Sequence, residues 1–148
     1  ELPYEDGPGH MLTEVGAEYG VTTGRRRRCG WFDGVIANYA ARVNGLTDIA
    51  LAKLDVLSEF DTIKVCVAYE VDGERYTTVP EHEARFAKAV PVYEELPGWK
   101  CDISGCRTFE ELPQEARDYV AYIEKLAKTR ISIVAVGPDR EQTIMRNW

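Results

Sequence analysis

The sequence lacks any apolar run long enough to cross a bilayer, and it shows no secretory signal pattern. We therefore expect a cytoplasmic protein that makes no membrane contact. Histidine is almost absent: neither His10 nor His82 has a cysteine or serine partner at a recognisable spacing. Both are predicted to be surface residues rather than catalytic ones.

Cysteine is also scarce. Of the four cysteines, Cys101 and Cys106 are closest in sequence, but no second pair or histidine lies at zinc-finger spacing. The pattern argues against a zinc site and is typical of reduced thiols in a cytoplasmic protein.

Positive charge is in deficit, with 18 Lys and Arg residues against 25 Asp and Glu residues and a formal net charge of −7. Because phosphate backbones attract basic surfaces, this balance argues against a general nucleic-acid binder. The 148 residues suit one domain with a core of its own.

Against this acidic background, the arginine loop (Val21–Trp31) holds four consecutive arginines, Arg25–Arg28, between Gly24 and Gly30. Guanidinium groups are always charged and repel one another unless anions lie among them or the chain separates them. A localisation patch, a nucleic-acid contact and a solvated turn are the alternatives. The flanking threonines and glycines favour a loop that holds more than one anionic group.

The remaining pattern predicts an α/β fold, part of a mostly parallel sheet flanked by helices, with an antiparallel hairpin. The continuous apolar run Ile49–Ala52 is typical of a strand buried on both faces. Other expected strands are Ile63–Val71, Arg75–Val79 after a turn at Asp72-Gly73, Val90–Tyr93 and Ile131–Val136. The expected helices are Leu12–Tyr19, Gly34–Asn44 between Asp33 and Gly45, Glu81–Ala89, and Pro113–Lys128.

The arginine loop also carries a family resemblance. Residues Thr22–Arg28, followed by Gly30-Trp31 and Asp33, resemble the substrate loop of adenylosuccinate synthetase, a family that joins IMP to L-aspartate at the expense of GTP. The resemblance implies that residues 1–148 are the C-terminal portion of such an enzyme, which has a P-loop NTPase-like fold and is typically a homodimer.

The same resemblance assigns roles within the loop. It implies that Thr23, Arg25 and Arg27 hold the aspartate carboxylates, that Arg25 also reaches the IMP ribose, and that Arg27 lies near GTP. The substrate-binding residues it implies are Val21, Thr22, Thr23, Gly24, Arg25, Arg26 and Arg27.

A Lys-x-Asp triplet, Lys53-Leu54-Asp55, follows the apolar run. Surface charge is the common explanation of such a triplet. A carboxylate there could instead accept hydrogen bonds from N1-H and the N2 amine of guanine, which adenine cannot offer, while the Lys53 stem covers the base. The triplet resembles the guanine-specificity element of GTP-binding proteins and of this family.

A third element, Ala135-Val136-Gly137-Pro138-Asp139-Arg140, resembles the turn where the family's backbone groups meet guanine, although the family usually has serine in place of Ala135. The GTP-contacting residues that the resemblance implies are Arg27, Lys53, Leu54, Asp55, Ala135, Val136 and Gly137.

No G-x-x-x-x-G-K-[S/T] phosphate loop is present in the sequence. The resemblance assigns that loop, the catalytic residues and the Mg²⁺ ligands to an N-terminal part, so we expect no catalytic or metal-binding residue here and no activity from this chain alone. The alternative is a binding module that senses a nucleotide or an acidic metabolite without catalysis.

Overall fold

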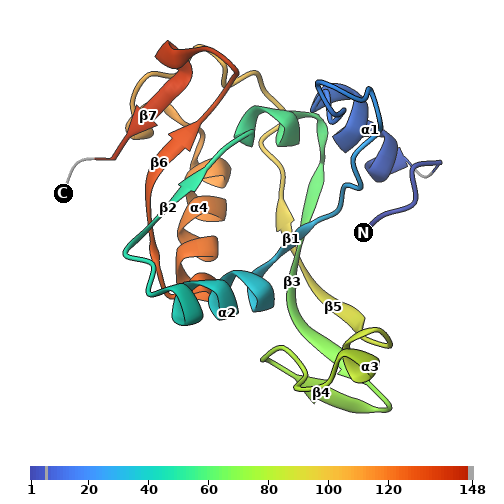
Figure 1. The fold of residues 1–148 in the computed structure, drawn as a ribbon. Coiled ribbons are helices and arrows are strands. Elements are labelled where there is room, and N and C mark those ends of the chain that lie inside the picture. The colour runs from blue at the N-terminus through green and yellow to red at the C-terminus, as the bar shows by residue number, and fades with distance from the viewer. Residues whose placement is uncertain (6, 147–148) are drawn as a thin grey trace.

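The computed structural model describes residues 1–5 and 7–146 and shows a mixed α/β fold with two sheets (Figure 1). The predicted fold class is therefore confirmed. One sheet contains β1 (Phe32–Asp33), β3 (Thr62–Val71), β4 (Glu74–Tyr76) and β5 (Val90–Pro97). The other contains β2 (Asp48–Leu51), β6 (Arg130–Ala135) and β7 (Thr143–Met145). The helices are α1 (Gly7–Val15), α2 (Gly34–Asn44), α3 (Glu83–Phe86) and α4 (Gln114–Ala127), with 3₁₀ turns η1 (Leu54–Glu59), η2 (Phe109–Glu111) and η3 (Arg140–Gln142).

In the first sheet, the long strand β3 is central. It pairs in parallel with β1 and antiparallel with β4 and β5. The predicted hairpin is confirmed, because Asp72 and Gly73 both have positive φ angles, 52° and 82°, and turn the chain into β4. This hairpin and α3 form an arm that extends from the body of the molecule (Figure 1).

The second sheet places two chain segments side by side. β2 and β6 are parallel, with Ile49 opposite Ile131 and Leu51 opposite Val134, and β7 pairs antiparallel with β6. The prediction that β2 is buried on both faces was wrong within this chain. Ile49 and Leu51 pack against the core, whereas Asp48 and Ala50 point to a face that stays exposed.

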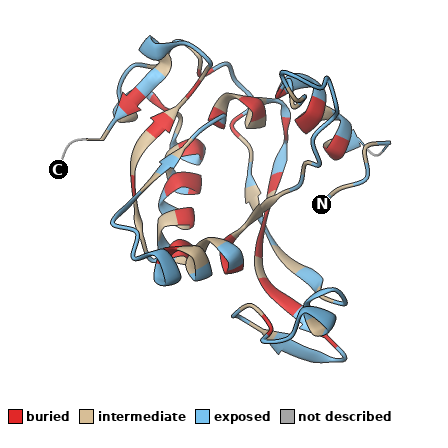
Figure 2. Cartoon of the chain, in the orientation of Figure 1, coloured by how far each residue is buried: buried red, intermediate tan, exposed pale blue. Residues whose placement is uncertain are grey.

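Helix α4 joins the two sheets through one core. Its buried face, Ala116, Tyr119, Val120 and Ile123, belongs to one core cluster with buried residues of β3 and β6. Figure 2 shows the buried segments of α4, β3 and β6 in red. Leu126 is only partly buried at the end of this face. At the C-terminus of the helix, Lys128 adopts a left-handed conformation with φ 53°.

Helix α2 begins and ends where the sequence predicts. The Asp33 carboxylate accepts hydrogen bonds from the backbone N–H groups of Val35 and Ile36, both at 3.0 Å, and Gly45 closes the helix with φ 59°. The outward side of α2 exposes Ile36, Tyr39 and Val43.

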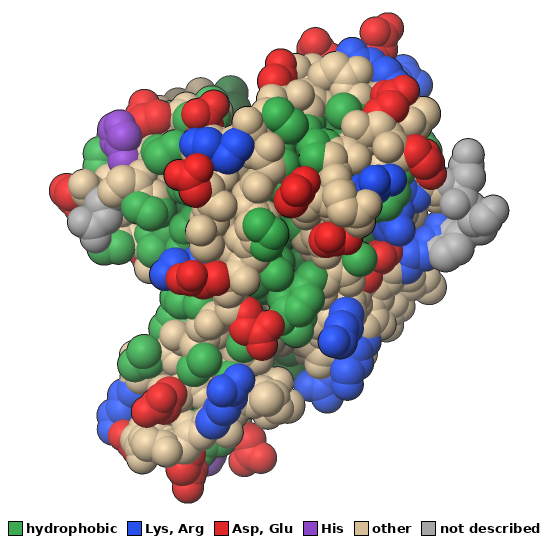
Figure 3. All heavy atoms as spheres, turned by 180° about the vertical axis from the view of Figure 1, so that it is seen from behind, with side chains coloured by type: hydrophobic (Ala, Val, Ile, Leu, Met, Phe, Trp, Pro, Cys, Tyr) green, Lys and Arg blue, Asp and Glu red, His purple; other side chains and the backbone are tan. Residues whose placement is uncertain are grey.

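The N-terminal helix differs from the prediction of Leu12–Tyr19. It ends at Val15, because Ala17 takes a left-handed φ of 48° and the chain then turns into the arginine loop. Seen from behind, the surface mixes acidic and basic side chains, and apolar side chains gather between the body and the arm (Figure 3). Within residues 1–5 and 7–146, no helix is both long and apolar enough to cross a membrane.

Candidate functional site

The arginine loop folds back on itself as a short hairpin. Gly20 N–H donates to the Arg25 carbonyl at 2.8 Å, and Arg27 N–H donates to the Glu18 carbonyl at 2.8 Å. Gly24 turns the chain with φ 63°, a conformation that side chains resist. The tip is fully open to solvent, and Val21 is 97% exposed. The loop therefore turns tightly at Gly24.

Three of the four arginines have different partners, which separates their charges. The Arg26 guanidinium lies over the Tyr4 ring at 3.8 Å, Arg27 pairs with Glu18 at 3.0 Å, and Arg28 pairs with Glu1 at 3.3 Å. The Arg25 guanidinium has no ion-pair partner within the described part of the chain. Its five donors are thus available to a ligand.

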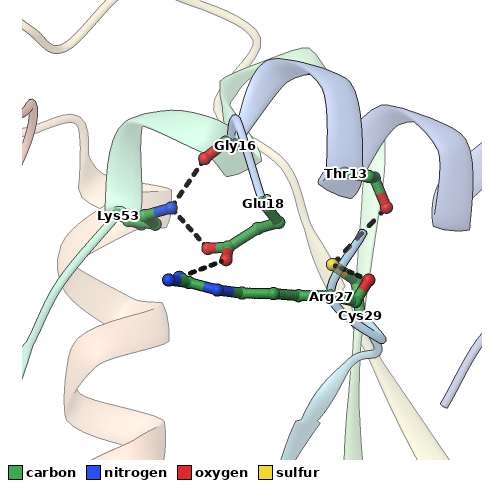
Figure 4. A network of polar contacts seen from close by, with 6 residues as sticks. All are labelled: Thr13, Gly16, Glu18, Arg27, Cys29 and Lys53. Atoms are coloured by element: carbon green, nitrogen blue, oxygen red, sulfur yellow. Dashed lines mark hydrogen bonds and ion pairs between the residues drawn. The ribbon is translucent and has the colours of Figure 1, made fainter. Parts of the chain in front are cut away.

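Lys53 connects the arginine loop to the second sheet. It follows β2 in a left-handed conformation, with φ 62°. Its ammonium donates to the Gly16 carbonyl at 2.6 Å and pairs with one oxygen of Glu18, whose other oxygen holds Arg27 (Figure 4). The hydrogen bond from Lys53, assisted by Arg27, lowers the pKa of Glu18 despite its partial burial.

Glu18 was missed by sequence reasoning. A glutamate three positions before the loop looks like any other surface acid, because its pairing with Lys53 crosses 35 positions. The one available signal was the hairpin itself, since folding the loop back brings residue 18 opposite residue 27.

Asp55 lies in η1, and its Oδ1 atom is buried without a hydrogen-bond partner in the described structure. A buried polar atom without a partner is costly and calls for an explanation. An acceptor that a ligand satisfies is one such explanation.

The turn Ala135–Gly137 lies beside the Lys53 element. Because β2 and β6 are parallel neighbours, residues 53–55 and 136–137 both follow the carboxyl ends of adjacent strands, and Ala135 is the last residue of β6. Ligands bind at this edge in open α/β sheets. Gly137 also has a packing role, since a Cβ atom there would lie 2.1 Å from Gln142 Oε1.

A cavity of about 380 Å³ opens between the loop and β2. Its charged side is formed by Glu18, Arg27, Arg28 and Lys53, and Leu12, Leu54 and Tyr119 contribute to its apolar side. The loop tip, Val21–Arg26, does not line it, nor do Asp55 and Ala135–Gly137. The structure thus brings Arg27 and Lys53 together and leaves the other predicted loop residues at the exposed tip.

The described residues contain no cluster of three or more His, Cys, Asp or Glu side chains placed to hold a metal ion.

Comparison with known proteins identifies the family of this chain. The family model for adenylosuccinate synthetase matches residues 1–144. The chain belongs to the adenylosuccinate synthetase family. This confirms the family that the arginine loop predicted.

The similarity extends over nearly the whole chain. Adenylosuccinate synthetase of Mycolicibacterium vanbaalenii is 59% identical over 141 residues, which is 95% of this chain and 33% of that protein. The Mycobacterium tuberculosis protein shows the same identity and coverage. The structure of fully ligated adenylosuccinate synthetase from Plasmodium falciparum superposes with a TM-score of 0.90 at 41% identity, covering 97% of this chain and 35% of that one. The chain thus spans about a third of the length of these relatives.

Proposed function

We propose that this chain is the C-terminal portion of a GTP-dependent ligase that joins L-aspartate to IMP, giving adenylosuccinate, GDP and phosphate. The observation that carries the proposal is the meeting of Arg27 and Lys53, from separate segments, at one cavity. Family membership supplies the reaction, and this meeting supplies a place where an acidic substrate and a nucleotide would be neighbours.

For aspartate, the proposed ligands are the Thr23 hydroxyl and the guanidinium groups of Arg25 and Arg27. A planar fork matches a carboxylate with two parallel hydrogen bonds, so two forks suit a dicarboxylate. Arg27 uses only Nη1 on Glu18 and keeps its other donors for a substrate. Arg25 also serves the IMP ribose, and the remaining loop residues, Val21, Thr22, Gly24 and Arg26, give the turn its shape.

For GTP, the proposed selector is Asp55. Its unpartnered Oδ1 is an acceptor in need of a donor, and guanine offers two adjacent donors on N1 and N2. The Lys53 stem covers one face of the base. Backbone groups of Ala135–Gly137, at the same strand edge, complete the pocket, so serine at 135 is not needed for these contacts.

The chain's own residues bind and orient anions, and this positioning is their contribution to the reaction. We assign no step through Mg²⁺ and no acid or base to this chain. Within the proposal, those groups belong to the remainder of a cytoplasmic, homodimeric enzyme.

The test uses the full-length protein that contains this chain. Purified protein is supplied with IMP, aspartate, GTP and Mg²⁺, and adenylosuccinate is followed by its absorbance. Formation that requires all three substrates is the expected result. Binding of guanine nucleotide or aspartate without turnover would instead establish the chain as part of a sensing module.

A further inference from the structure

Glu18 is held more firmly than a surface acid. Its backbone N–H donates to the Thr13 carbonyl of α1 at 2.9 Å, and its carbonyl accepts from Arg27 N–H at 2.8 Å. Its side chain is 20% exposed, against 55% for Arg27 and 48% for Lys53. The backbone of Glu18 is therefore held in place, and its carboxylate sets the positions of the Arg27 and Lys53 side chains.

The two oxygens of Glu18 serve different segments. Oε2 accepts from Arg27 Nη1 of the arginine loop, and Oε1 accepts from Lys53 Nζ after β2 (Figure 4). Lys53 Nζ has a further acceptor in Gly16 O at 2.6 Å. With its ammonium fixed at one end and its backbone at the other, the methylene stem of Lys53 has little freedom to leave the cavity wall.

We propose that Glu18 is a positioning residue that couples the aspartate subsite to the guanine subsite by holding Arg27 and Lys53 with one carboxylate. The inference deepens the proposed function and rests on it. A base that packs against the Lys53 stem restricts the existing Lys53–Glu18 pair further, and the second oxygen of the same carboxylate then orders Arg27 for the substrate before it arrives. Such coupling is reciprocal, so aspartate strengthens guanine binding by the same factor.

The test compares the wild-type full-length enzyme with its Glu18→Gln variant, which keeps the size of the side chain and removes its charge. In the wild type, we expect the KM for aspartate to fall as GTP rises from well below to well above its own KM. In Glu18→Gln, we expect the KM for aspartate to rise about tenfold at saturating GTP and to become independent of GTP. We expect kcat to stay within about twofold, because Glu18 does not reach the reacting atoms.

Two further variants make the result specific. Glu18→Asp keeps the charge on a shorter stem and should restore part of the dependence on GTP. Glu59→Gln removes an exposed charge at the other end of η1 and should behave as the wild type. If Glu18→Gln does not fold, Glu18→Asp decides the question. A weakened dependence of the aspartate KM on GTP supports the coupling role, and an unchanged dependence refutes it.

The outcomes separate this inference from the function on which it rests. A wild-type enzyme that forms no adenylosuccinate refutes the proposed function. An active wild type whose aspartate KM does not respond to GTP, or a Glu18→Gln variant that keeps the response, refutes the coupling role alone. A variant that loses kcat and thermal stability together, with an unchanged response, shows Glu18 to be merely structural.

Discussion

Among single side chains, Asp55 gives the sharpest test of nucleotide choice. Asp55→Asn replaces one acceptor by an amide donor, which conflicts with the guanine N1-H and suits the carbonyl that xanthine has at C2. In the full-length enzyme we expect kcat/KM for GTP to fall about a hundredfold and xanthosine triphosphate to become the better substrate.

The matched control is Asp61→Asn, which alters an exposed aspartate that pairs with Lys100. It should leave nucleotide preference unchanged. Parallel kinetics with both nucleotides check the assignment, and an unaltered preference in Asp55→Asn would remove Asp55 from the base pocket.

Arg27, which lines the cavity together with Lys53, tests the proposed aspartate subsite. Arg27→Leu removes a charged fork, and hydrogen bonds to charged groups contribute about 1.5–3 kcal/mol each. We expect the KM for aspartate to rise between about tenfold and a hundredfold. Arg75→Leu, on the exposed strand β4, is the control. Wild-type aspartate kinetics in Arg27→Leu would contradict the role.

Turning from side chains to elements, the cap of α2 should be worth measurable stability. Asp33 accepts two backbone hydrogen bonds at 3.0 Å and a third from the Tyr69 hydroxyl of β3. We expect Asp33→Ala to lower the free energy of unfolding by about 1–2 kcal/mol. Denaturant titration of the folded protein measures the loss, with exposed Glu81→Ala as the reference. An unchanged midpoint would mean that water replaces the cap.

The turn after β6 offers a second test. Gly137→Ala would place a methyl group 2.1 Å from Gln142 Oε1, so Gln142 must move and its hydrogen bonds to Asp139 and Ser104 are disturbed. We expect Gly137→Ala to lower the free energy of unfolding by about 1–3 kcal/mol. In the double variant with Gln142→Ala, the added cost of the methyl group should disappear, and a double-mutant cycle in denaturant checks this.

These elements also show what the sequence can predict. Both ends of α2 were found because Asp33 and Gly45 act on the backbone beside them, and the β3–β4 hairpin was found for the same reason. The burial of β2 was predicted wrongly, because it depends on what covers each face of the sheet. The arginine loop and Lys53 were identified separately, but their meeting through Glu18 depends on tertiary structure.

For the molecule as a whole, the decisive fact is its length relative to the family. Because the chain spans about a third of its relatives and holds no phosphate-loop motif, we expect residues 1–148 alone to form no adenylosuccinate. The full-length protein, assayed at the same molar concentration, is the control. Turnover by the isolated chain above a no-protein blank would contradict this division of labour.

The exposed face and outer edge of β2 have a practical consequence. β2 pairs only with β6 among the described strands, so the backbone groups along its other side have no strand partner there. An open edge of this kind is a template on which a second polypeptide can add a strand, so two isolated copies can associate by pairing their β2 edges. The isolated chain should therefore tend to associate as its concentration rises. Dilution, or the substitution Ala50→Lys, should keep it monomeric.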